Sequence, residues 1–293
     1  MGRKKWKKWA TGYMYLLPSI IFLCAFTVFP VFASFYISLT QWTLIKPPEF
    51  IGLENYKNLF NDPTFYRTLW HTAYYTFGSV PLSIILSLLL AVAMNQKIKG
   101  ITIFRSMYFL PVISTWVAVA IIWRWIYNPQ FGLLNAFLKI FGIPPQNWLG
   151  EPKLAMPSVI ITSVWKGLGY NMILFLAGLQ NISENYYEAA KIDGASKWAQ
   201  FRYITIPLIS PTTFFVLITS IISSFQVFGP IYTMTNGGPV GSTEVLIFYL
   251  FQNGFRWYKM GYASSIAWVL FLIIFIFTLI QYFSSKRWVH YGA

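Results

Sequence analysis

Residues 260–285 read MGYASSIAWVLFLIIFIFTLIQYFSS, a stretch of 26 residues without Asp, Glu, Lys or Arg. A helix needs about 20 mostly apolar residues to cross a bilayer, so this stretch predicts a transmembrane helix. Similar uncharged runs occupy 9–45, 68–96, 106–123 and 203–243, and a sixth run, 154–183, is interrupted only by Lys166. We therefore predict an all-α membrane protein with six transmembrane helices, near 13–39, 72–94, 105–126, 156–180, 206–228 and 262–283.

The composition of the 293-residue chain agrees with this fold class. It is 56% hydrophobic and only 10% charged, whereas a soluble protein carries about 25% charged residues. A soluble enzyme, a disordered tail and a nucleic-acid-binding domain are therefore excluded. The net charge of +14 indicates a membrane whose inner face attracts cations. One cysteine, Cys24, excludes an internal disulfide, and two histidines, His71 and His290, are too few to predict a metal site.

The amino-terminus carries a basic cluster, residues 3–8, before the first apolar run. This order resembles a signal peptide, but the apolar core of a signal spans only about 7–15 residues and ends at a small-residue cleavage site. The run here is far longer, so we expect a retained first helix. Six helices place both termini on one side, and the excess of Lys and Arg, Lys97 included, makes that side the cytoplasm.

The expected organisation follows from this topology. Residues 1–12 form a basic cytoplasmic amino-terminus, 13–283 a single six-helix domain and 284–293 a short cytoplasmic carboxy-terminus. Three outer connections, 40–71, 127–155 and 229–261, hold most of the turn-forming Pro, Gly and Asn residues. The longest polar inner connection is 181–203.

Residues 183–207, which begin in that inner connection and extend just past it, read SENYYEAAKIDGASKWAQFRYITIP. Ser183 and Ser196 can each cap a short helix, and Glu184 favours the positive end of the first helix dipole. Asp193-Gly194 is a stop signal, because glycine readily takes the left-handed conformation that ends a helix. The residues alone leave two interpretations open, a solvated amphipathic loop or a helix-turn-helix that docks into a groove of a partner.

The spacing in this segment resembles the EAA loop of bacterial binding-protein-dependent ABC importers. Glu188-Ala189-Ala190 is followed by Gly194 six positions after the Glu and by Pro207 nineteen after it. The family usually has Leu before that proline, where this chain has Ile206. The resemblance implies the type I ABC importer permease fold, with a coupling helix for an ATPase formed by Glu188, Ala189, Ala190, Asp193, Gly194 and Ala195.

Further motifs extend the resemblance along nearly the whole chain, namely FIGLENY at 50–56, NDP at 61–63, YNPQFG at 127–132, WKGLGYN at 165–171 and TNGGP at 235–239. They are similar to carbohydrate-uptake permeases, in particular the larger maltose permease and the first glycerol-3-phosphate permease. The large outer domain and the additional amino-terminal helix pair of the maltose permease are missing here, which implies a compact six-helix form.

The resemblance also implies an assembly in the bacterial cytoplasmic membrane. Its other members would be a second, related permease, two cytoplasmic ATPase subunits and an extracytoplasmic sugar-binding protein, without nucleic acid. The sequence has no Gly-x-x-x-x-Gly-Lys-Ser/Thr motif to cradle ATP phosphates. We therefore expect ATP and Mg on the ATPase subunits, and neither a cofactor, a metal nor a catalytic residue in this chain.

A sugar cavity needs aromatic faces for the apolar side of the ring and fixed polar groups for its hydroxyls. Gly167, Tyr170 and Asn171 share one face of the fourth predicted helix, and a polar stripe on the fifth reaches Gln226, with Phe225 beside it. Such residues can also simply let membrane helices pack and hydrogen-bond. The resemblance favours the sugar interpretation, so we expect Tyr170, Asn171, Phe225 and Gln226 to contact the sugar and Gly167 to make room for it.

Other functions stay open as alternatives. A permease for a phosphate ester such as glycerol 3-phosphate, or for an amino acid, would share the EAA loop. A membrane enzyme would need paired ionisable residues at one depth, and a channel would need a charged or carbonyl-lined filter; the sequence shows neither pattern. Lys166, near the middle of a predicted span, either snorkels or pairs with a backbone carbonyl, or it lies in the cavity near the sugar.

Overall fold

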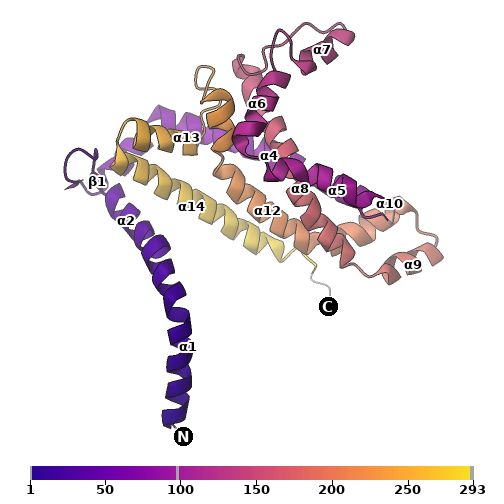
Figure 1. Ribbon diagram of the computed structural model, residues 1–293, viewed down its shortest axis with the longest axis horizontal. Coiled ribbons are helices and arrows are strands. Elements are labelled where there is room, and N and C mark those ends of the chain that lie inside the picture. Colours follow the sequence, from indigo (N-terminus) through magenta and orange to yellow (C-terminus); the bar gives the residue numbers. More distant parts are fainter. Residues whose placement is uncertain (1, 97–98, 291–293) are drawn as a thin grey trace. The chain divides into compact units, whose positions relative to one another are not determined.

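The computed structural model describes residues 2–96 and 99–290, and these are mostly helical (Figure 1). Lys97 of the inner basic set, residue 98 and the last three residues of the expected carboxy-terminal segment lie outside this description, as do the side chains of residues 2–8, 10 and 11. The chain forms two compact units, Met1–Asp62 with Leu250–Val269 and Pro63–Tyr249 with Leu270–Ala293. The expected division at 12/13 and 283/284 stays a prediction.

The first unit begins with a long apolar helix. It consists of α1 (Gly2–Leu23), a π-helical turn η1 (Cys24–Val28) and α2 (Phe29–Ser38). The π turn lies just before Pro30, which has no amide hydrogen for the regular helical bond, so the backbone widens there without breaking. Two short strands follow, β1 (Thr40–Gln41) and β2 (Glu49–Phe50), paired antiparallel with Thr40 opposite Phe50.

The FIGLENY motif, residues 50–56, secures this turn. It leads into α3 (Glu54–Phe60), where Asn55 Nδ2 donates to the carbonyl oxygens of Ser38 and Thr40, both at 2.8 Å. The Tyr56 hydroxyl lies 2.7 Å from Ser38 Oγ. Because a buried carbonyl needs a hydrogen-bond partner, these contacts give the motif a structural role. The unit also holds η4 (Gln252–Arg256) and the first part of α14 (Met260–Ser285).

The second unit contains the remaining helices. In chain order they are α4 (Pro63–Met94), α5 (Ile101–Ile113), α6 (Trp116–Ile126), α7 (Leu133–Ile140), α8 (Pro152–Gln180), α9 (Glu184–Ile192), α10 (Lys197–Gln200), η2 (Phe201–Thr205), α11 (Ile206–Leu208), α12 (Ser210–Phe225), η3 (Ile231–Thr235), α13 (Leu246–Phe251) and the end of α14. Helix α8 packs against α4, α5 and α12. Two clusters of buried apolar side chains hold it there, one around Tyr127, Val159 and Phe248 and the other around Ala91, Phe175 and Ile209.

Four helical segments of the described chain are long and apolar enough to cross a membrane, namely Gly12–Ser38, Pro63–Met94, Pro152–Gln180 and Met260–Ser285. Two further candidates are bent pairs: the chain bends by 101° between α5 and α6, and by 63° between Lys197–Leu208 and α12. The predicted spans 105–126 and 206–228 are thus each broken. Prolines lie near both breaks: Pro111 precedes the first by three residues, and Pro207 and Pro211 flank the second.

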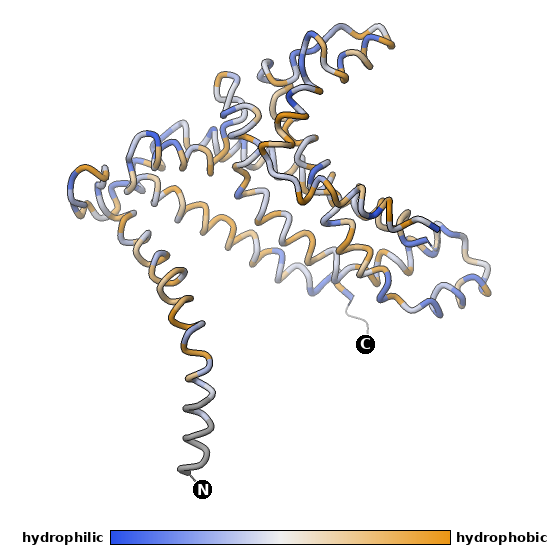
Figure 2. Tube along the Cα trace, in the orientation of Figure 1, coloured by the Kyte–Doolittle hydropathy of each residue, from blue (hydrophilic) through white to orange (hydrophobic). Residues whose placement is uncertain are grey.

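Hydropathy alone missed these bends because it records composition and not direction. Figure 2 shows apolar residues along the long helices and hydrophilic residues in the connections between them. The three predicted outer connections contain short helices, α3, α7 and α13.

Candidate functional site

A cavity of about 390 Å³ lies among α4, α6, α8, α12 and the segment that follows α12. Seven of the nineteen described residues that line it are Ser or Thr, four are aromatic and none is charged. The aromatic members are Tyr75, Trp116, Tyr170 and Phe228. The cavity therefore offers hydroxyl, amide and ring surfaces to a ligand and no formal charge.

Four of the five residues predicted to bind sugar line this one cavity: Gly167, Tyr170, Asn171 and Gln226. Tyr170 is 49% exposed, so its ring is open to a ligand. Asn171 is buried, and its Nδ2 donates to Ser83 Oγ at 3.1 Å. A Cβ added at Gly167 would meet nothing within 4 Å, so the space beside this glycine is open.

Phe225, the fifth predicted residue, lies elsewhere. Its side chain is only 3% exposed, and its ring centroid is 5.4 Å from that of Phe277 in α14. Helix α12 ends at Phe225, and successive helical residues point about 100° apart, so Phe225 and Gln226 face different neighbours. Phe228 lines the cavity in its place.

Several lining residues were not predicted from the sequence, among them Trp116, Ser79 and Ser83. Trp116 enters from the start of α6, beyond the bend that hydropathy could not show. Ser79 and Ser83 enter from α4, and their spacing of four on an apolar helix was the signal that could have identified them. Ser79 Oγ is buried without a hydrogen-bond partner in the described structure.

The polar segment after α8 forms the predicted helix-turn-helix. Ser183 caps α9, with its Oγ accepting a hydrogen bond from the Asn185 amide at 3.4 Å. Ser196 caps α10 in the same way, accepting from the Ala199 amide at 3.2 Å. Both predicted caps are confirmed. The local sequence is sufficient to build the segment, because each cap lies within three residues of its partner.

The turn between these helices closes at Gly194, whose φ of +78° confirms the predicted left-handed stop. The Ala195 amide donates to the Ala190 carbonyl at 2.8 Å, the bond that closes such a helix end. Farther back on α9, the Tyr187 hydroxyl lies 3.0 Å from Thr205 Oγ1. This contact ties α9 to the turn that leads into α11 and α12.

The outer surface of the helix-turn-helix is accessible. Among the predicted coupling residues, Glu188, Ala189, Asp193 and Gly194 are exposed, and Ala190 and Ala195 are half-buried. Two large apolar side chains beside them are mostly exposed, Ile192 at 87% and Trp198 at 71%. Apolar side chains left open among polar ones are typical of a surface that binds another protein.

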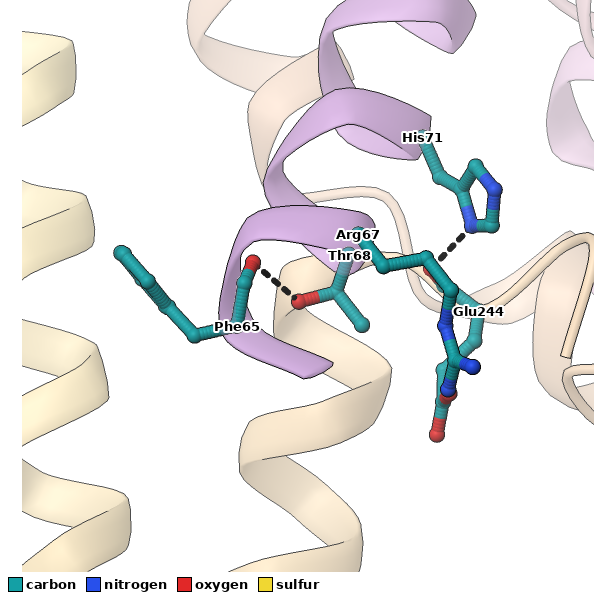
Figure 3. A network of polar contacts seen from close by, with 5 residues as sticks. All are labelled: Phe65, Arg67, Thr68, His71 and Glu244. Carbon is teal, nitrogen blue, oxygen red and sulfur yellow. Dashed lines mark hydrogen bonds and ion pairs between the residues drawn. The ribbon is translucent and has the colours of Figure 1, made fainter. Parts of the chain in front are cut away.

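Figure 3 shows how the first turns of α4 hold Glu244, in the loop that carries the TNGGP motif. Arg67 Nη2 donates to Glu244 Oε2 at 2.9 Å, and His71 Nδ1 lies 3.0 Å from the Glu244 carbonyl. Just beyond, the Leu246 amide donates to Thr72 Oγ1 at 2.9 Å. The Arg67 side chain is 50% exposed, so solvent weakens the ion pair and the contacts to the backbone do most of the anchoring.

No group of three or more His, Cys, Asp or Glu that could hold a metal ion occurs within the described residues. The second unit thus contains an uncharged cavity and a helix pair with exposed apolar side chains. A family model for the binding-protein-dependent transport system inner membrane component matches residues 60–290. The chain belongs to this family.

This permease is similar to known proteins over nearly the whole length of both chains. It is 41% identical to the probable ABC transporter permease protein YesP of Bacillus subtilis, over 96% of this chain and 92% of the relative. It is 36% identical to the arabinooligosaccharides transport system permease protein AraP of the same species, over 94% and 88%. Such relatives are permease subunits, so the chain is a multi-pass transport subunit and not an enzyme.

A solved structure shares the fold. A chain of a bacterial alginate ABC transporter, in complex with an alginate pentasaccharide-bound periplasmic protein, matches with a TM-score of 0.87 at 23% identity, covering 99% of both chains. The predicted class of importer permease fold is therefore correct.

Proposed function

We propose that this permease is the transmembrane subunit of an ATP-driven importer that moves a sugar or an oligosaccharide across the bacterial cytoplasmic membrane. The observation that carries the proposal is the uncharged cavity lined by hydroxyl, amide and aromatic groups. A sugar ring stacks its apolar C–H face on aromatic rings, and its hydroxyls pair with fixed polar groups. The relative named for arabinooligosaccharides supports the same class of substrate.

Within this cavity, Tyr170, Asn171 and Gln226 contact the sugar, and Gly167 leaves room for the ring. Phe228 takes the stacking role that the sequence assigned to Phe225, because Phe228 lines the cavity and Phe225 does not. A phosphate ester fits less well, since phosphate is bound by Arg, Lys or a helix amino-terminus. None of the described lining residues is charged.

The assembly follows from the family. A second permease completes the pore, two cytoplasmic ATPase subunits bind ATP and Mg, and an extracytoplasmic binding protein delivers the sugar. The chain crosses the membrane six times, each bent pair counting as one span, and both termini are cytoplasmic. Helix α9, with Glu188 to Ala195, is the coupling helix that an ATPase groove receives, and its exposed apolar neighbours support that role.

The proposal is tested with the complete importer, including its binding protein, reconstituted in proteoliposomes. ATP hydrolysis and uptake are measured with maltose, lactose or arabinotriose as neutral saccharides, and with glycerol 3-phosphate or histidine as competitors of another class. We expect a neutral saccharide to stimulate both activities. Stimulation by glycerol 3-phosphate or histidine, and by no saccharide, would contradict the proposal.

A further inference from the structure

Lys166 occupies the middle of α8, where a membrane lysine is costly unless something compensates its charge. Its Nζ donates to the Val112 carbonyl of α5 at 3.1 Å and lies 5.1 Å from the ring centroid of Trp116. The ammonium therefore has two partners, a backbone oxygen and an aromatic face. It is not among the residues that line the cavity.

The Val112 carbonyl lies at the end of a helix. In an unbroken helix it would accept the amide hydrogen of Trp116, but Trp116 begins α6 on the other side of the 101° bend. Carbonyls at a helix carboxy-terminus lack helical partners and carry partial negative charge. A cation placed there satisfies the carbonyl and stabilises the helix end, so Lys166 caps α5.

Two other side chains complete this break. Ser114 Oγ donates to the Leu110 carbonyl at 3.1 Å, and Thr115 Oγ1 accepts the Ala118 amide hydrogen bond at 3.3 Å, which caps α6. These two caps come from the bend itself. Lys166 is the contact that comes from another helix, so it ties the bend to α8.

The reach of Lys166 is fixed by a close approach of two backbones. Three residues farther along α8, a Cβ at Gly169 would lie 2.1 Å from the Tyr108 carbonyl oxygen of α5. Only glycine permits this approach, and residues three apart lie on the same side of a helix. The close packing at Gly169 therefore fixes the position of Lys166 opposite the end of α5.

The Trp116 indole connects the Lys166 contact to the cavity. It lines the cavity, and it packs on the backbone of Gly229, where an added Cβ would lie 2.6 Å from Trp116 Cδ1. The indole is thus flanked by Gly229 and by the Lys166 ammonium. Its position depends on a bend that Lys166 holds.

We infer that Lys166 is a positioning residue, which caps α5 at the bend and thereby presents the Trp116 indole as a stacking wall for the transported sugar. This inference rests on the proposed function for the stacking role alone. The structural part, the hold on the bend, is independent of the substrate.

The first experiment measures the bend in the complete importer. Cys24→Ser provides the background, and spin labels at Ile103 of α5 and Ile122 of α6, both exposed, report their separation by double electron–electron resonance. Lys166→Met removes the charge, and we expect the distance distribution to shift and broaden. Lys166→Arg restores a cation, and we expect it to restore the distribution. Lys153→Met, at an exposed lysine of the same helix, is the matched control and leaves it unchanged.

The second experiment measures uptake, per assembled complex, of the saccharide that the wild-type importer accepts. Lys166→Met and Trp116→Leu each lower uptake about three- to tenfold, the range of one cation–π or stacking contact. The double variant takes up sugar no more slowly than the single variant with the lower uptake, because both changes remove the same stacking surface. Lys166→Arg recovers uptake, and Trp125→Leu, at an exposed tryptophan outside the cavity, has no effect.

Either of two results overturns the inference: a wild-type distance distribution in Lys166→Met, or losses that multiply in the double variant. If the wild-type importer takes up no saccharide, the proposed function fails instead. The spin-label distances still decide whether Lys166 holds the bend.

Discussion

The helix pair α9–α10 and the cavity belong to the same unit but depend on different kinds of information. In the helix pair, each decisive contact joins residues a few positions apart, as between Ser183 and Asn185. In the cavity, Asn171 pairs with Ser83, 88 positions away. The first can be deduced from local sequence rules. The second depends on which helix faces meet, and no local rule gives that.

The largest expected effect separates the helix pair from the loop at Val240, which we expect on the opposite side of the membrane. In a Cys24→Ser background, we expect Asp193→Cys in the helix pair to be shielded from an impermeant maleimide in intact cells. Val240→Cys, at a residue that is 92% exposed in the outer loop, should react fully. Labelling is measured before and after permeabilisation, which should make both positions reactive. The reverse pattern would show that the topology is inverted.

Next in size is the loss expected from Gly194→Arg. Its left-handed backbone disfavours any side chain by about 1–2 kcal/mol, and the added side chain blocks the proposed ATPase contact. We expect insertion to persist while uptake and ATPase stimulation fall more than about tenfold. Gly100→Arg is a matched control, because Gly100 also has a positive φ, +83°, and open space around it. Equal losses in both variants would assign the effect to strain and not to docking.

A smaller effect is expected in the cavity. Tyr170→Ala removes an exposed ring and Gln226→Ala an exposed amide, and each should lower sugar uptake about three- to tenfold, the value of one stacking or hydrogen-bonding group. Tyr74→Ala removes an exposed tyrosine of α4 that does not line the cavity, and uptake should stay at the wild-type level. Complex assembly is measured alongside. Wild-type uptake by both cavity variants would mean that these faces are packing surfaces.

The smallest effect is expected from Ser183→Ala, which removes one cap. Loss of such a cap costs about 1 kcal/mol of helix stability, so amides in the first turn of α9 should exchange with solvent about fivefold faster. Amides of α8 in the same sample provide the reference and should not change. An effect that spreads into α8 would break the contrast between a locally built helix pair and a cavity held by distant contacts.

The sequence was informative where neighbouring residues determine the structure. Both caps of the helix pair, its glycine turn and the apolar runs followed from composition and spacing. The bend at Ser114–Thr115 did not, because apolar residues continue through it on both sides. Phe225 and Gln226 show the same limit, since one step along α12 separates a side chain packed on α14 from one that lines the cavity.

The sequence left the role of Lys166 open for a related reason. The sequence placed a cation within a span but could not show that α5 would end beside it. Only the fold brings the free carbonyl of Val112 to the ammonium.

The angle between α5 and α6 also sets how far this pair of helices extends across a bilayer. At a rise of about 1.5 Å per residue, the 13 residues of α5 extend about 20 Å and the 11 of α6 about 17 Å. At 101° their outer ends lie about 24 Å apart, short of a hydrocarbon core about 30 Å thick. A span built from this pair therefore needs a locally thinner bilayer, or neighbouring protein that covers its polar backbone.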